Sequence, residues 1–164
     1  MVNANRNRIR TSRVHSISLL LINTIMIKQE PTNIAIAAYG LLIPHNEEAD
    51  GTVFGYTMWN TGGFPVALER TVRPADHPIR VKIIRVSLHG LKCCDVVENT
   101  PYMYKRITRN IQMDNKEIIK AWFYVGVKAF WMHRPLQPQI MDGDWKKFSN
   151  ERYDRVMNPP VEQQ

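Results

Sequence analysis

The sequence predicts an α+β fold: a small mixed or antiparallel β-barrel of about six strands, with one helix between strands and a C-terminal helix. Three observations predict it. Short apolar segments recur along the chain and are separated by turns that contain glycine or proline. Helical periodicity occurs in only two segments, so strands and helices do not alternate as in a parallel α/β sheet. The chain of 164 residues is long enough for one domain with its own core.

Four strands are expected in the first part of this domain. The apolar run 33–40 ends at a glycine and predicts a buried first strand. A second strand is expected at 52–59, and the two glycines in 60–63 favour a turn into a short third strand at 64–69. Residues 79–88 intersperse charged with apolar side chains, which is typical of a half-buried strand.

Two helices and a long hairpin complete the prediction. A helix is expected at 89–97, where apolar residues recur at every third position. Two long strands, 101–113 and 116–127, follow with a tight turn between them. A proline-broken loop then leads to a closing helix at 144–157, which Asp144 is placed to cap.

The basic character of the chain is concentrated at its N-terminal end. The net charge is +7, yet five of the 22 basic residues and none of the 15 acidic residues fall within 1–28. We interpret 1–30 as an appendage to a domain at 31–157, with a tail at 158–164. The appendage is a disordered basic arm, a docking helix, or a segment that precedes the real start at Met26. As an arm it would give weak, nonspecific contact with nucleic acid.

Composition argues against several classes of protein. The longest apolar stretch, 16–27, is interrupted by polar residues and is too short to span a membrane. The cysteines, Cys93 and Cys94, are adjacent, so a disulfide between them is disfavoured. No CxxC pair or histidine pair with ligand spacing occurs, so we expect no metal site. These features favour a reduced, cytoplasmic protein.

Two stretches carry the candidate site. In "DVVENTPYMYKR" (95–106), Glu98 lies at the end of the predicted helix beside apolar residues. It is either a solvated helix end or an acid/base whose pKa is raised by an apolar setting. In "AAYGLL" (37–42), a strand stops at Tyr39-Gly40, and the backbone N–H groups of such a turn can hold a carboxylate or an oxyanion. An anion cradle together with one acid is suited to chemistry on an amino-acid derivative.

At this point the chain resembles the γ-glutamylcyclotransferase-like, or AIG2-like, superfamily over roughly residues 33–147. The pattern is most similar to the γ-glutamylamine cyclotransferase branch. The resemblance rests on five pieces in order: "AAYGLL", "VFGYTMWNTGGFPVALE", "LKCCDVVENTPYMYKR", "KAWFYV" and "GDW". It implies the γ-glutamylcyclotransferase-like fold.

The resemblance also implies a reaction and roles for residues. The α-amine of a γ-glutamyl amide attacks its own γ-carbonyl and gives 5-oxoproline and a free amine or amino acid, without a cofactor. Glu98 takes the place of the general acid/base. Tyr39, Gly40, Leu41 and Leu42 line the pocket for the γ-glutamyl group, and Tyr104 borders it.

The chain departs from the family pattern at several positions. Leu41 stands where the family often has serine or threonine, and Asn99 stands where many members have glycine. Tyr104 is either a packing residue or a substrate contact, and Arg106 is either a pocket residue or an ion-pair partner.

Three functions fit this sequence. The first is a γ-glutamyl amide cyclotransferase that acts on a small-molecule substrate. The second is a non-catalytic module that binds a metabolite or a protein on the same scaffold. In the third, the basic N-terminal segment binds nucleic acid or a partner and the barrel is only a platform.

Overall fold

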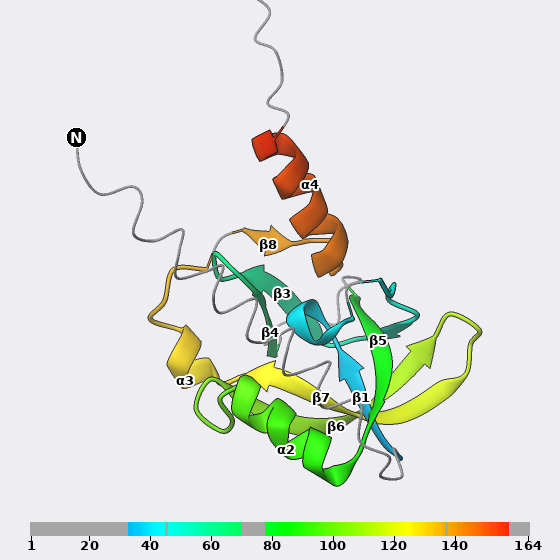
Figure 1. The fold of residues 1–164 in the computed structure, drawn as a ribbon. Helices are drawn as coiled ribbons and strands as arrows, with labels where there is room; N and C mark the ends of the chain where they lie inside the picture. The colour runs from blue at the N-terminus through cyan, green and yellow to red at the C-terminus, as the bar shows by residue number, and fades with distance from the viewer. Residues whose placement is uncertain (1–32, 45, 70–77, 137, 158–164) are drawn as a thin grey trace, which may run out of the picture.

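The structure, a computed structural model, describes residues 33–44, 46–69, 78–136 and 138–157. The predicted appendage at 1–30, with Met26, and the predicted tail at 158–164 lie outside these residues. Figure 1 shows a barrel with helices outside it and a second, smaller sheet beside it. The described elements are β1 (Ile34–Ala38), the 3-10 turn η1 (Gly40–Leu42), β2 (Gly51–Val53), β3 (Tyr56–Asn60), β4 (Pro65–Glu69), β5 (Ile79–Val86), α2 (Leu88–Val97), β6 (Tyr104–Met113), β7 (Ile118–Gly126), α3 (Lys128–Trp131), β8 (Gln139–Ile140) and α4 (Trp145–Met157).

The predicted α+β barrel is confirmed, and its strands form two sheets. A closed barrel has the order β1-β5-β2-β6-β7, and a three-stranded sheet has the order β4-β3-β8. The barrel is mixed, because β1 pairs antiparallel with β5 and parallel with β7. The other pairs of the barrel are antiparallel, and the long β6–β7 hairpin runs from Tyr104 opposite Gly126 to Gln112 opposite Ile118. Parallel pairing of β1 with β7 places the first and last barrel strands side by side and closes the barrel.

The prediction of one strand at 52–59 is wrong. The chain leaves β2 at Phe54-Gly55 and enters β3, which belongs to the other sheet. Gly55 has a φ of +89°, a conformation that residues with a side chain rarely adopt. A continuous strand cannot contain this kink, so the two halves pair with different partners: β2 with β5 and β6, and β3 with β4 and β8.

Two hydrophobic clusters stabilise the fold. One cluster, which includes Phe123, Val81 and Ile111, joins the barrel strands to β3, β4 and β8. The other, which includes Ile36, Leu91 and Tyr124, packs α2 and Trp131 against the opposite face of the barrel strands. Successive residues of β1 and β7 contribute to the two clusters in turn, because strand side chains alternate between faces.

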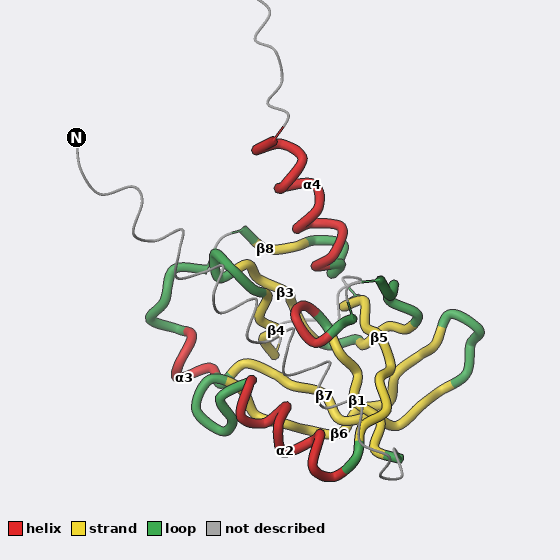
Figure 2. Tube along the Cα trace, viewed as in Figure 1, coloured by secondary structure: helices red, strands yellow, loops and turns green. Residues whose placement is uncertain are grey.

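The helices agree with the predicted positions, with one addition. α2 begins after Ser87, whose Oγ accepts a hydrogen bond from the N–H of Gly90 at 3.1 Å. α4 is capped by Asp144, as predicted, through the N–H of Lys147 at 3.1 Å. The short α3 and the two-residue β8 were not predicted; both lie between the long hairpin and α4. Figure 2 shows α2 against the barrel and α4 at the other end of the molecule, beside the smaller sheet. Among the described residues, no helix is long and apolar enough to cross a membrane.

Candidate active site

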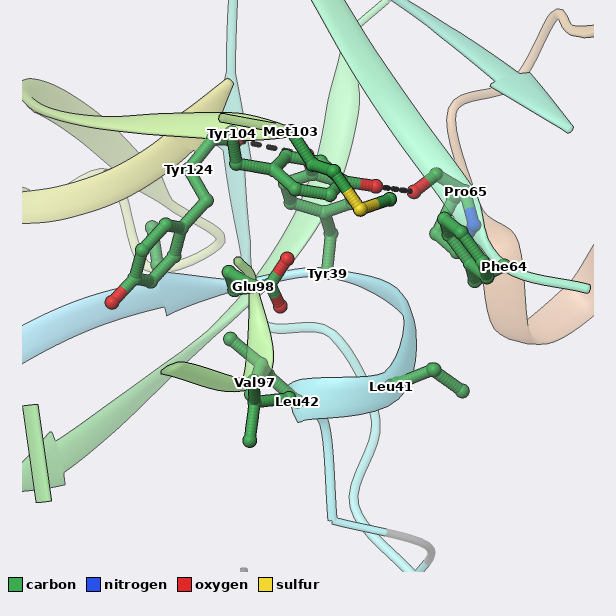
Figure 3. Close-up of a pocket in the computed structure, with 11 residues that line it drawn as sticks. Tyr39, Leu41, Leu42, Phe64, Pro65, Val97, Glu98, Met103, Tyr104 and Tyr124 are labelled. Carbon is green, nitrogen blue, oxygen red and sulfur yellow. Dashed lines mark hydrogen bonds between the residues drawn. The ribbon is translucent and has the colours of Figure 1, made fainter. Parts of the chain in front are cut away.

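A cavity of about 220 Å³ lies next to the end of β1, where the two hydrophobic clusters meet (Figure 3). β1, η1, the start of β4, the end of α2 and the strands of the long hairpin all contribute to its wall. The residues that line it are Ala37, Tyr39, Leu41, Leu42, Phe64, Pro65, Val97, Glu98, Met103, Tyr104 and Tyr124. All but Glu98 are apolar or aromatic.

The cap at the end of α2 fixes the position of Glu98. The backbone N–H of Glu98 donates to the carbonyl of Cys94 at 2.9 Å. The next residue, Asn99, has a φ of +50°, the left-handed conformation that glycine and asparagine adopt most readily after a helix. The N–H groups of Asn99 and Thr100 donate back to carbonyls of the last turn at 3.1 and 2.9 Å. This pair of bonds is a Schellman motif, so the chain turns sharply where Glu98 meets the cavity.

The carboxyl group of Glu98 faces the cavity rather than bulk water. In Figure 3 it points into the space bordered by Tyr39 and Tyr104. No donor among the described residues forms a hydrogen bond or ion pair with it. Burial in this apolar wall raises the pKa of the Glu98 carboxyl from 4.5 to about 7. The pKa rises because desolvation disfavours the charged form. The carboxylate is therefore a stronger base than an exposed one, and both protonation states are populated near neutral pH.

An ion pair holds α2 against the barrel one turn before Glu98. Asp95 accepts a hydrogen bond from Arg106 Nη1 at 2.7 Å and another from the hydroxyl of Tyr124 at 2.7 Å. The guanidinium of Arg106 also lies over the ring of Trp122, 4.7 Å from its centroid. Of the two roles left open for Arg106, the ion pair is the one the structure has. Asp95 thus fastens the helix to β6 and β7, which keeps Glu98 in place.

The turn η1 forms another part of the cavity wall, through Leu41 and Leu42. Gly40 has a φ of +70°, and a Cβ built there would lie 2.4 Å from Pro65 Cγ, so only glycine fits. The first N–H groups of a helical turn lack intrahelical acceptors. Apart from bonds within the turn itself, no hydrogen bond among the described residues uses the N–H groups of Gly40 or Leu41. Such a turn can donate to a carboxylate or an oxyanion.

Two of the three tyrosines that line the cavity, Tyr39 and Tyr104, use their hydroxyls to hold the backbone. Tyr39, 7% exposed, donates to the carbonyl of Tyr124 at 2.8 Å and accepts from the N–H of Ala67 at 3.2 Å. Tyr104, 3% exposed, donates to the carbonyl of Pro65 at 2.9 Å. Burial raises the pKa of both hydroxyls, so they stay protonated. The two rings are therefore fixed walls, and they tie the barrel to β4.

Five of the six residues expected at the site line this one cavity, although they come from three separate segments of the chain: Tyr39, Leu41, Leu42, Glu98 and Tyr104. The sixth, Gly40, is not a lining residue and lies in η1 between Tyr39 and Leu41. Six further residues line the cavity and were not among the predicted site residues, although each lies in a motif that the sequence singled out: Ala37, Phe64, Pro65, Val97, Met103 and Tyr124. Ala37 lies two positions before Tyr39 and shares its face of the strand, so alternation could have found it. Val97 and Met103 directly adjoin predicted residues.

The cysteines and histidines of the described residues do not line this cavity. Among the described residues, no group of three or more His, Cys, Asp or Glu side chains could hold a metal ion. Burial raises the pKa of the Cys94 thiol to about 12, so it stays protonated. Cys93 lies 3.6 Å from the ring of His89 on the exposed side of α2.

A family model described as "Gamma-glutamyl cyclotransferase, AIG2-like" matches residues 28–147. The chain belongs to this family. By family it is a γ-glutamylcyclotransferase-like enzyme. No curated protein matches the chain by sequence.

Three solved structures are similar to this AIG2-like chain. An Arabidopsis thaliana protein has a TM-score of 0.51 and 18% identity over 76% of this chain and 87% of its own. A protein specific to uropathogenic E. coli has a TM-score of 0.50 and 14% identity over 71% of this chain and 95% of its own. An AIG2-like protein from Mus musculus has a TM-score of 0.49 and 18% identity, covering 65% of this chain and 86% of its own. At these identities the first two likenesses show the fold alone.

The geometry explains one departure from the AIG2-like pattern. Asn99 occupies a left-handed position directly after Glu98, where many family members have glycine. Asparagine is the residue that most readily replaces glycine there. The departure therefore leaves the turn intact.

Proposed function

We propose that this AIG2-like protein is a γ-glutamyl amide cyclotransferase in which Glu98 is the general acid and base. The substrate is a γ-glutamyl amide, and the products are 5-oxoproline and a free amine. The observation that supports it most directly is the carboxyl group of Glu98, which has a pKa raised to about 7 and faces a small apolar cavity that the turn η1 also lines.

The reaction moves two protons, one after the other, from the attacking nitrogen to the leaving nitrogen, and Glu98 carries each of them. The α-ammonium of the substrate gives a proton to the Glu98 carboxylate, and the freed amine attacks the γ-carbonyl carbon. The carbonyl electron pair moves to oxygen, and the N–H groups of η1 are suited to stabilise the negative charge there or to bind the α-carboxylate. Protonated Glu98 gives its proton to the leaving nitrogen as the bond from the γ-carbon to that nitrogen breaks. The ring nitrogen still carries two hydrogens, so it gives one to the regenerated Glu98 carboxylate, which passes this proton to the released amine.

Two terms lower the barrier in this scheme. The attacking amine and the γ-carbonyl belong to one molecule. A site that holds the γ-glutamyl chain bent brings them together before the reaction and so removes part of the entropic cost of ring closure. The fixed rings of Tyr39 and Tyr104 limit the conformations available to the bound γ-glutamyl group. Each backbone donor on the oxyanion is worth about 3 kcal/mol in comparable sites.

The test is formation of 5-oxoproline from γ-glutamyl amides, measured by mass spectrometry for the full chain and for Glu98→Gln. Gln has almost the same shape but cannot carry the proton, so turnover should fall by at least about a hundredfold. Glu117→Gln, at an exposed position of the β6–β7 turn, is the matched control and should keep full activity. Unchanged turnover in Glu98→Gln would refute the role of Glu98. Amide binding without product would favour the non-catalytic module.

Two further expectations accompany this proposal and rest on the sequence alone. Weak contact of residues 1–28 with nucleic acid would be seen as salt-sensitive binding that is lost when these residues are deleted. A cytoplasmic location would be seen by fluorescence microscopy of the tagged full chain.

A further inference from the structure

We propose that Leu41, Phe64, Val97 and Met103 form an apolar subsite for the leaving amine, so that the protein selects γ-glutamyl amides of uncharged, apolar amines. This inference rests on the proposed function and adds the class of amine. It comes from the outer part of the cavity, which the reaction scheme above does not use.

The lining of the cavity divides into a deep part and a mouth. The deep residues are buried, and the mouth residues are half-buried. The deep set, with Glu98 at its edge, encloses the γ-glutamyl group in our proposal. The amine leaves from the γ-carbon, next to Glu98, and its substituent then extends toward the mouth. The deep residues are Ala37, Tyr39, Leu42, Pro65, Tyr104 and Tyr124, and the mouth residues other than Glu98 are Leu41, Phe64, Val97 and Met103.

The described side chains of the mouth include no cation for a negatively charged substituent. Among the described residues that line the cavity, none is Lys, Arg or His, and Glu98 is the one ionisable carboxyl. A carboxylate on the leaving amine would lose its water without gaining a cation. It would also lie close to the negative form of Glu98, and like charges placed together raise the free energy. An uncharged substituent avoids both costs and buries its carbon atoms against the four apolar side chains.

The mouth is held in shape by contacts outside the cavity. The ring of Phe64 packs edge-on against Trp131 at 6.1 Å between centroids. The carbonyl of Phe64 accepts hydrogen bonds from Thr61, from its N–H at 3.0 Å and its Oγ1 at 2.7 Å. The carbonyl of Met103 accepts from Trp131 Nε1 and from the N–H of Val127, both at 2.9 Å. A fixed apolar surface loses little entropy on binding, which favours selection by shape and polarity.

Two matched substrate pairs test the selection. γ-Glutamyl-n-butylamide and γ-glutamyl-norvaline differ only in the carboxylate next to the leaving nitrogen. γ-Glutamyl-n-pentylamide and the ε-linked γ-glutamyl-lysine differ only in the charged groups at the far end of the chain. We expect kcat/KM for each uncharged amide to exceed that of its charged partner, by more than about tenfold in the first pair. Lengthening the chain from methylamide to butylamide should raise kcat/KM by up to about fourfold per methylene.

A charge at the mouth should change this preference in a defined direction. Met103→Lys places a cation at the mouth, while the backbone bonds of Met103 are kept. In this variant the ratio of kcat/KM for butylamide to that for norvaline should fall by about tenfold or more, because the carboxylate gains a partner. Met103→Gln, polar but uncharged, is the control and should lower the ratio far less. Circular dichroism and thermal unfolding check that both variants fold.

The outcomes separate this inference from the proposed function. The apolar subsite is refuted if kcat/KM for γ-glutamyl-norvaline and ε-linked γ-glutamyl-lysine equals that for the alkyl amides. It is also refuted if Met103→Lys leaves the ratio of kcat/KM between butylamide and norvaline substrates unchanged. In both cases the proposed cyclotransferase activity is unaffected. If no amide gives 5-oxoproline, the proposed function is refuted and the subsite falls with it.

Discussion

At Glu98, one carboxyl group lies in an apolar wall, and its protonation governs the proposed reaction. Its pKa is raised to about 7 by burial, and the base form is the deprotonated one. We therefore predict that kcat/KM rises about tenfold per pH unit below pH about 7 and levels off above it. Initial rates of 5-oxoproline formation across this range measure the profile. A profile that is flat through neutral pH would mean that another group transfers the proton.

The hydroxyl of Tyr104 stabilises the fold through the carbonyl of Pro65. Tyr104→Phe leaves that buried carbonyl without its donor, so we predict a loss of about 1–3 kcal/mol in the free energy of unfolding. Urea unfolding followed by fluorescence measures it. Tyr102→Phe is the control, because Tyr102 is 72% exposed, and it should leave stability unchanged. Equal stability of both variants would contradict the structural role.

Single residues were predictable to the extent that their neighbours in the sequence reveal their surroundings. Glu98 and the 39–42 turn stand out because each interrupts an apolar run. Arg106 remained open, since its partner Asp95 lies eleven positions away on another element and the pairing exists only once α2 packs on β6. Tyr124 lies in the apolar segment "KAWFYV", so the local sequence does not distinguish it from a core residue. Its place in the cavity depends on the pairing of β6 with β7.

Among the elements, the turn η1 depends on Gly40 for two reasons: its positive φ, and its approach to Pro65. We predict that Gly40→Ala lowers the free energy of unfolding by more than about 2 kcal/mol and reduces kcat/KM, because β4 or η1 must shift. Gly62→Ala separates the two causes. Gly62 also has a positive φ, +103°, but a Cβ there would meet nothing within 4 Å. Gly62→Ala should therefore lower the free energy of unfolding only through backbone strain, by about 1 kcal/mol. Equal losses in both variants would show that contact with Pro65 is unimportant.

The end of α2 gives a second test at this scale. Asn99 holds the left-handed position that aligns Glu98 with the cavity. Asn99→Gly should fold as well as the native chain, because glycine adopts this φ without strain. Asn99→Ala should lose about 1 kcal/mol and lower kcat more than Asn99→Gly does. Thermal unfolding and steady-state rates for both variants measure the difference. A native-like rate in Asn99→Ala would show that the turn does not position Glu98.

The elements that the sequence predicted best are those with a strong local pattern. The long hairpin and α2 are in this group, and their bounds differ from prediction by a few residues. The split between β2 and β3 has a local signal too, since Gly55 interrupts an apolar run, and an isolated glycine in a strand indicates a bulge or bend. α3 and β8 have four and two residues, too few for any periodicity to develop.

For the molecule as a whole, the cavity arises where two hydrophobic clusters meet and neither fills the space. No local pattern could predict this, because the wall is assembled from β1, β4, α2 and the long hairpin. The resemblance to the AIG2-like family supplied what local patterns lacked, namely that 37–42 and 95–106 contribute to one pocket. The fold thus leaves an acid in an apolar cavity, which should reduce stability.

This cost gives a prediction for the stability of the whole protein. The pKa of Glu98 is about 7 in the folded state against 4.5 ordinarily. Between these values the folded state binds more protons than the unfolded state, so the contribution of Glu98 to the free energy of unfolding falls as pH rises. Above about pH 7 the loss is complete and amounts to about 3 kcal/mol. Gln at this position is neutral at every pH and escapes the loss.

We therefore predict that Glu98→Gln is more stable than the native chain at high pH, although it is inactive. The gain in free energy of unfolding should be about 1–3 kcal/mol near pH 8 and close to zero near pH 4.5, where Glu98 is already protonated in the fold. Urea unfolding at both values measures it, and taking the difference between the two proteins cancels the titration of other carboxyl groups. Glu117→Gln, which replaces an exposed carboxyl, should show no such trend. A gain that does not depend on pH would mean that Glu98 is solvated, and the raised pKa on which the acid/base role depends would be lost with it.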